Sequence, residues 1–213
     1  NSKIQLGIAS DLTIQHNATN SVINNATGQL RVAGDDLRLM NKDEDETYAT
    51  FANDGAATLY YDNSKIIETV SAGASVYGAM KLQNGFLREN INIVANKLSV
   101  APTLNLDNGM VHYFTTQESA VATPNVISGA GINTDMAIGD TFALTVITTA
   151  ASGGYSANWR VDGVEASAGV TSSWVGGSAP SAGGSSGLDT YALTFIKTAS
   201  ARYTMIGNLV NSA

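Results

Sequence analysis

Short stretches of alternating apolar and polar residues, separated by turn-forming residues, run through the amino-terminal half of the chain. In ATLYY, Leu59 and Tyr61 share one face of an extended strand. Residues 62–65 (DNSK) then supply turn formers before Ile66 resumes the pattern, which predicts a β-hairpin. Strands are predicted in the same way at residues 12–14, 30–32, 37–39, 48–51, 59–61, 66–70 and 76–82. No long window keeps a helical period, so we expect an all-β protein.

Longer strands are predicted in the carboxyl-terminal half, at residues 110–116, 140–150, 158–164, 188–198 and 201–210. Residues 87–97 fit a short helix or a strand, and their apolar spacing favours the strand. A change of pattern between residues 82 and 109 predicts two domains, residues 1–85 and 86–213. We expect the second domain to be an antiparallel β-sandwich of the jelly-roll type. Its glycine-rich segment 175–187 is long enough to be mobile or functional.

Composition restricts the partners of the chain. Only 14% of the 213 residues are charged, the net charge is −7, and the 11 Lys and Arg residues form no cluster, which argues against nucleic acid as a partner. No apolar run is long enough to span a membrane, and the opening NSKIQLG does not resemble a signal peptide. There is no cysteine, which leaves packing or oligomerisation to supply stability. Because an isolated hairpin is marginal in water, the amino-terminal strands need partners, and these partners could be other chains.

Signatures of catalysis are sparse. His16 and His112 are the only histidines, and no nucleophile elbow, zinc-protease, phosphate-binding or dinucleotide-binding motif occurs. We therefore expect a protein that is not an enzyme and that needs no cofactor. The alternative, a glycan hydrolase, would need paired carboxylates in a groove. Its candidates would be Asp43, Glu46, Asp140 and Asp162, but turns explain them.

Two places in the sequence are candidate metal sites. Residues 41–46 (NKDEDE) resemble the start of a calcium loop, but the glycine and glutamate that such a loop carries at its sixth and twelfth positions are Glu46 and Ala52 here. A solvated acidic turn is the better interpretation. His16 could bind a metal only if three chains met on an axis, so a turn histidine is favoured. We expect no metal.

Aromatic residues beside glycine- and serine-rich loops are the candidates for receptor binding. Tyr155, Trp174 and Tyr191 could stack on carbohydrate rings, and Trp174 next to segment 175–187 is the best placed of them. Trp159 lies in an alternating run, which favours a place in the core.

Several short motifs run through the chain. In the amino-terminal half they are KIQLG (3–7), SDLTIQH (10–16), NSVI (20–23), GQLRV (28–32), DDLRL (35–39), NDGAATLYYDNSKIIET (53–69) and GASVYG (73–78). In the carboxyl-terminal half they are LRENINI (87–93), NGMVHYFTT (108–116), WVGGSAPSAGGSSGLDTY (174–191) and IKTASARYTMIGNL (196–209). In these motifs, over nearly its whole length, the chain resembles tail fibres and other virion appendage proteins of marine bacteriophages, especially phages of cyanobacteria. One departure is the turn of the repeat, where Ala18 replaces the family's glycine.

The resemblance implies a homotrimer whose chains wrap a common axis. In that arrangement Leu59, Tyr61, Ile66 and Val76 would form the core between chains, in a trimeric β-repeat shaft. We therefore expect a tail-fibre component on the exterior of a phage particle, joined to other virion proteins and in contact with a polysaccharide or protein of the host surface. The alternatives are a capsid decoration or head-fibre protein and, less favoured, a tailspike-like hydrolase or a bacterial adhesin.

Overall fold

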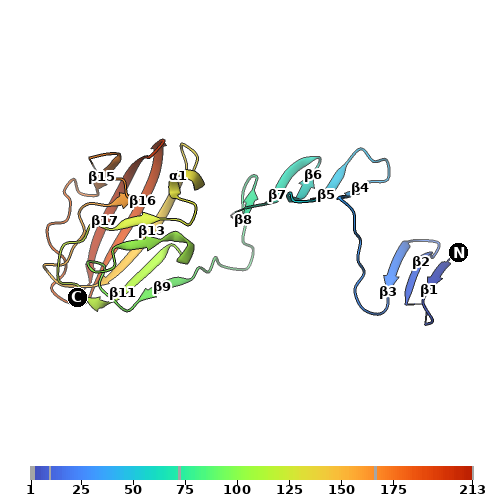
Figure 1. Cartoon of the computed structure of the whole chain (residues 1–213), viewed down its shortest axis with the longest axis horizontal. Helices are drawn as coiled ribbons and strands as arrows, with labels where there is room; N and C mark the ends of the chain where they lie inside the picture. Colours follow the sequence, from blue (N-terminus) through green and yellow to red (C-terminus); the bar gives the residue numbers. More distant parts are fainter. Residues whose placement is uncertain (1–2, 10, 72, 166, 213) are drawn as a thin grey trace. The chain divides into compact units, whose positions relative to one another are not determined.

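Strands make up almost all regular structure in the computed structural model, which describes residues 3–9, 11–71, 73–165 and 167–212 (Figure 1). The chain is therefore all-β, as the alternating pattern predicted. It divides into an amino-terminal unit, Asn1–Gly85, and a carboxyl-terminal unit, Phe86–Ala213. This division coincides with the expected domain boundary.

The amino-terminal unit begins with a three-stranded antiparallel sheet. Its strands, in order, are β1 (Lys3–Leu6), β2 (Leu12–His16) and β3 (Ser21–Asn25). The turn between β2 and β3 contains Ala18 with φ 75, a left-handed conformation that favours glycine. The Asn17 side chain holds this turn by accepting hydrogen bonds from the backbone N–H groups of Thr19 and Asn20. The chain thus forms this turn at some cost in backbone strain.

A five-stranded antiparallel meander follows in the same unit. Its strands are β4 (Asp36–Met40), β5 (Thr47–Ala52), β6 (Ala57–Tyr61), β7 (Ser64–Val70) and β8 (Gly73–Val76). The predicted hairpin joins β6 to β7 through Asp62 and Asn63, whose φ angles of 49° and 56° are those of a type I′ turn. Ile66 is the extra residue of a β-bulge, because Leu59 pairs with Ile67 and Tyr60 with Lys65.

Two predicted strands differ from the structure. Residues 30–32 form no strand, and both Leu30 and Val32 are exposed. Of the predicted strand 76–82, only Val76 lies in a strand, because β8 ends there and residues 77–82 form none. In both places the sequence alternates, but a strand also needs a neighbouring edge to bond its backbone groups.

The carboxyl-terminal unit contains two sheets. The larger has the order β15 (Val170–Trp174), β17 (Arg202–Ser212), β16 (Leu188–Ala199), β13 (Thr141–Thr149), β11 (Val111–Gln117) and β9 (Ile91–Val94). The smaller has the order β10 (Thr103–Asn105), β12 (Asn125–Ile127) and β14 (Arg160–Val161). Residues 87–97 thus contain the strand β9, as predicted, and no helix.

Successive strands from β9 to β14 alternate between the two sheets. As a result β9, β11 and β13 run parallel in the larger sheet, and β10, β12 and β14 run parallel in the smaller one. The β15–β17 pair is parallel as well, whereas β16 pairs antiparallel with both β13 and β17. The expectation of an antiparallel sandwich is therefore wrong for the parallel pairs. Each crossover through the opposite sheet returns the chain in its original direction.

A single hydrophobic core lies within the carboxyl-terminal unit. Its largest buried side chains are Trp159, Tyr191, Tyr203, Phe114 and Phe195. Leu104, Val126 and Val161 bring the small sheet into this core. The Trp159 and Tyr191 rings meet edge to face with centroids 5.7 Å apart. Burial of Trp159 confirms its prediction as a core residue.

Candidate binding surfaces

The five-stranded sheet of the amino-terminal unit carries an apolar row on one face. Leu39, Ala49, Leu59, Ile67 and Val76 are paired in turn across β4 to β8 and so lie on the same face. We call these five residues the apolar row. Leu59 is 51% exposed, although it occupies the middle of the sheet. A central strand normally buries this position, so the row is suited to cover by a partner.

The opposite face of the same sheet is polar. The neighbouring row consists of Arg38, Thr50, Thr58, Glu68 and Ser75. Glu68 accepts hydrogen bonds from Lys65 Nζ, at 2.5 Å, and from the hydroxyl of Tyr77. These bonds lower the pKa of the Glu68 carboxyl and raise that of Tyr77. The sheet is thus amphipathic, with a polar face and an apolar face on which Leu39 and Leu59 are exposed.

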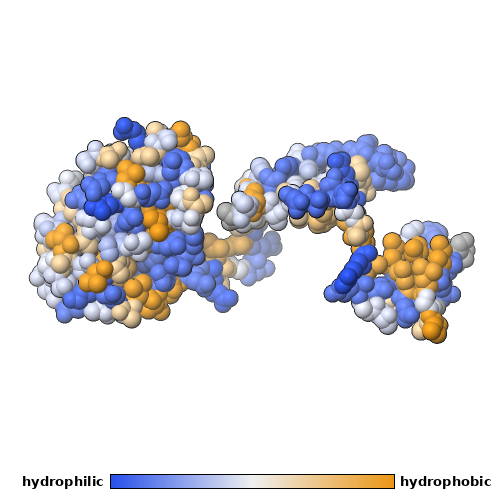
Figure 2. Space-filling view, in the orientation of Figure 1, coloured by the Kyte–Doolittle hydropathy of each residue, from blue (hydrophilic) through white to orange (hydrophobic). Residues whose placement is uncertain are grey.

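The three-stranded sheet repeats this arrangement. Ile4, Ile14 and Ile23 face one another across β1, β2 and β3, and all three are exposed. Leu6 and Leu12 form the next pair on the same face. Figure 2 shows the resulting hydrophobic patch over this sheet. Two separate sheets of the amino-terminal unit therefore each present an apolar face.

The four residues expected to form an inter-chain core take different positions. Leu59 and Val76 belong to the apolar row, and Tyr61, two residues beyond Leu59 on β6, is 77% exposed. Ile66 is the bulge residue, so its neighbour Ile67 takes the place in the row. Sequence analysis missed Ile67 because a bulge shifts the alternation by one residue, which a periodic pattern cannot reveal.

Tyr155, Trp174 and Tyr191 do not form a common exposed surface. Tyr191 is 1% exposed, and its hydroxyl accepts a hydrogen bond from the Ser156 N–H at 2.9 Å. Burial raises the pKa of Tyr191 to about 12, so the phenol stays neutral. A core ring has no free face for a sugar, and the hypothesis that Tyr191 stacks on a receptor does not fit this position. Tyr155 is half-buried and lines the same small hollow as Tyr191 and Glu118.

Trp174 is half-buried rather than fully exposed. Its indole N–H donates to the Ala157 carbonyl at 3.2 Å, and its ring packs against Gly207 and the core. The adjoining segment 175–187 is fixed at its second half, because both carboxylate oxygens of Asp189 accept the Gly184 N–H at 3.0 Å. Asp189 is itself buried and also accepts from Asn211. The second half of the glycine-rich segment is therefore held against the carboxyl-terminal unit by hydrogen bonds.

Other buried charged groups have structural partners too. Glu118 accepts hydrogen bonds from the backbone N–H groups of Leu98 and Ser99 and from the Ser99 hydroxyl. Lys197 Nζ donates to the carbonyls of Asn133 and Met136, at 2.6 and 2.7 Å, at the end of the short helix α1 (Ile132–Asp135). Sequence analysis missed both, because their partners are distant in the sequence.

The carboxylates considered for catalysis are engaged in turns. Asp162 accepts hydrogen bonds from the backbone N–H groups of Ile132 and Asn133 at the start of α1. Asp140 accepts one from the Ala137 N–H at 2.7 Å. Asp43 and Glu46 lie in the turn between β4 and β5, in the other unit. Two of the four candidates thus lie in each unit, and Asp140 and Asp162 bind different backbone groups.

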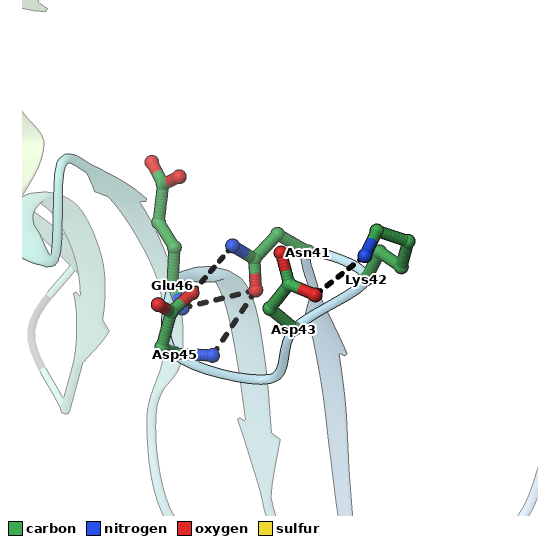
Figure 3. A network of polar contacts seen from close by, with 5 residues as sticks. All are labelled: Asn41, Lys42, Asp43, Asp45 and Glu46. Carbon is green, nitrogen blue, oxygen red and sulfur yellow. Dashed lines mark hydrogen bonds and ion pairs between the residues drawn. The ribbon is translucent and has the colours of Figure 1, made fainter.

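The acidic segment 41–46 is the predicted solvated turn (Figure 3). Asn41 organises it, because its side-chain oxygen accepts the backbone N–H groups of Asp45 and Glu46 and its amide donates to Asp45 Oδ1 at 2.6 Å. The Asp43 carboxylate instead pairs with Lys42 at 2.6 Å. Within the described part of the chain, no group of three or more His, Cys, Asp or Glu residues is placed to hold a metal ion.

The two histidines occupy opposite environments. His16 is exposed, with Nδ1 3.3 Å from the Ser21 hydroxyl, as expected for a turn-edge residue. His112 is fully buried on β11, with Nδ1 3.1 Å from the side-chain nitrogen of Asn92. Burial lowers the pKa of His112, and this favours the neutral ring.

Comparisons of the chain with known protein families, curated proteins and solved structures found no match. No helix among the described residues has the length and hydrophobicity to cross a membrane. The amino-terminal sheets present exposed apolar residues on one face each, and these faces are the candidate binding surfaces.

Proposed function

We propose that this protein is a non-enzymatic structural component of a bacteriophage virion, a homotrimeric fibre segment that contacts the host surface. The single observation that carries the proposal is the apolar row. It lies on one face of a sheet whose opposite face carries a row of polar residues. Fully burying a Leu or Ile side chain stabilises a protein by about 1.5–3 kcal/mol. Three identical chains that turn their rows toward a common axis would recover this free energy.

Identical copies fit the row because the row itself carries no charge that would oppose their approach. Only 14% of the residues are charged, and each of the five residues in the row is uncharged. Closing such faces inward also protects a sparsely charged protein from aggregation. The trimer and the virion location are supported by the motifs shared with phage appendage proteins. Three copies per fibre would raise a weak affinity for the host surface through avidity.

The oligomeric state tests this proposal. By sedimentation equilibrium, we expect a mass three times the 22.1 kDa of one chain. Leu59→Asp should dissociate the assembly, because it places identical carboxylates in the contact. Tyr48→Asp is the matched control: Tyr48 lies on β5 outside the apolar row and is 49% exposed, against 51% for Leu59. A monomeric wild-type chain at micromolar concentration would refute the proposal.

A capsid decoration or head-fibre protein is the second candidate, favoured by the same shared motifs. Immunogold labelling of the particle separates the two functions. Label at the tail or baseplate supports a tail fibre, whereas label distributed over the capsid supports decoration. Release of reducing ends from host polysaccharide would instead indicate a hydrolase and contradict the non-enzymatic proposal.

A further inference from the structure

The larger sheet of the carboxyl-terminal unit has one face outside the core. Its inward-facing residues alternate with a second set that includes, in one row across four strands, Val111, Thr145, Ala192 and Asn208. The adjacent rows add Ile93, Tyr113, Ile147, Thr190, Val210, Ala143, Thr194, Ile206 and Ser173. We call these thirteen residues the outer face. All are described, and none is charged.

Such a face is unusual for a surface in contact with water. The solvent side of an antiparallel sheet normally carries charged and polar side chains. Here Thr, Ala, Ile and Val predominate, and Ile93, Ile206 and Val210 are exposed. The nearest charge along β17 is Arg202, which lies at the hairpin end beyond the Ile196–Thr204 pair. The composition is therefore that of a contact surface.

The outer face contains a hollow. It lies over β13, β16 and β17, and the small side chains of Ala143, Ala192 and Thr194 are among those that line it. Ile206 and Val175 stand at the same hollow, and both are exposed apolar residues. A projecting apolar side chain beside a hollow lined by small residues can insert into the same hollow of an identical chain.

Charge also favours a copy of this chain as the occupant. Each chain carries a net charge of −7, so identical copies repel wherever charged surfaces meet. An uncharged face is where such copies can approach at the smallest electrostatic cost. If the amino-terminal units associate as proposed above, the covalent connection also holds the carboxyl-terminal units at a high effective concentration.

We propose that the outer face is a second self-association surface, through which the carboxyl-terminal units of the assembled chains pack together. The inference rests on the proposed homotrimer. It assigns to the carboxyl-terminal unit a role in assembly, so that a host contact made by this unit would use its other surfaces.

A spin-label experiment on the full chain tests this assignment. The chain has no cysteine, so Asn208→Cys gives a single nitroxide site on the outer face. Double electron–electron resonance should show a narrow distribution of short distances between chains. Adding Ala192→Lys, next to Asn208 in the same row, should broaden or abolish it. Adding Ala120→Lys instead, at an exposed loop position off the outer face, should leave it unchanged.

The outcomes separate this inference from the proposed function. A monomer in sedimentation overturns the homotrimer and the inference together. A trimer in which the Asn208→Cys label gives a broad distribution overturns the outer-face contact alone. A trimer whose narrow distribution survives Ala192→Lys also overturns it, because a lysine in the hollow would face its own copies across a closed interface. Purified protein contains no other virion component, so a narrow distribution lost only with Ala192→Lys supports contact between copies.

Discussion

The two units of this chain use the same alternation of apolar and polar residues and reach opposite results. In the carboxyl-terminal unit the apolar sides of two sheets meet around Trp159 and Tyr191. In the amino-terminal unit each sheet leaves its apolar face open, and Ala49 is the one hydrophobic residue of that unit among those described as buried. Alternation therefore states that one face of a strand will be covered, but it does not state which chain supplies the cover.

Trp159→Ala should have the largest effect on this contrast. Trp159 is fully buried, and removal of such a side chain leaves a cavity that costs about 3–5 kcal/mol of unfolding free energy. Leu59→Ala, measured at a concentration where the chain is monomeric, should change the stability of the carboxyl-terminal unit by less than about 0.5 kcal/mol. Urea unfolding followed by tryptophan fluorescence reports on this unit in both variants, because Trp159 and Trp174 both lie in it. Equal losses of stability in the two variants would show instead that the two units share one core.

Lys197→Met should have the next largest effect. It removes the cation that binds the Asn133 and Met136 carbonyls, and buried acceptors left without donors cost about 1–3 kcal/mol. Lys42→Met is the control, because the Lys42 side chain is 89% exposed and its ion pair with Asp43 is solvated. Thermal unfolding of the two variants measures the difference. Similar melting temperatures would mean that the contacts of Lys197 contribute little to the carboxyl-terminal unit.

Ala18→Gly should have the smallest effect, and in the opposite direction. Glycine relieves the strain of φ 75 but loses more entropy on folding, so a net stabilisation of up to about 1 kcal/mol is expected. Gly28→Ala is the reverse test in the same unit, because Gly28 has φ 67 and open space around its Cα. Hydrogen exchange of β2 and β3 should slow in the first variant and accelerate near residue 28 in the second. Faster exchange of the β2 and β3 amides in Ala18→Gly would show that the Ala18 backbone is not strained.

Much of the fold follows from local pattern, and the failures have identifiable causes. The hairpin at Asp62 and Asn63 can be predicted from the sequence because its turn is two residues long and joins neighbouring strands. The parallel pairing of β9, β11 and β13 cannot be predicted from the sequence, because a strand alternates in the same way whether its neighbour runs parallel or antiparallel. The crossovers through β10 and β12 decide that direction, and they involve contacts distant in the sequence.

The candidate binding residues also differ in whether local alternation or distant strand pairing decides their position. Leu59 and Val76 could be placed on an apolar face from alternation alone, because their strands are regular up to those positions. Tyr191 was misplaced because an aromatic residue next to a flexible-looking loop resembles a binding residue, and only its strand register with Val146 and Leu209 puts it in the core. The position of a residue in a strand therefore predicted whether it is exposed better than its residue type did.

The place of β17 has a consequence for synthesis of the chain. Although β15 precedes β16 and β17, its described partner is β17, and β16 also pairs with β17 along most of its length. Until the ribosome has translated past Arg202, β15 lacks this partner and one edge of β16 stays open. The carboxyl-terminal unit therefore acquires its native sheet late in translation, and a chain truncated before Arg202 would be a substrate for chaperones and proteases.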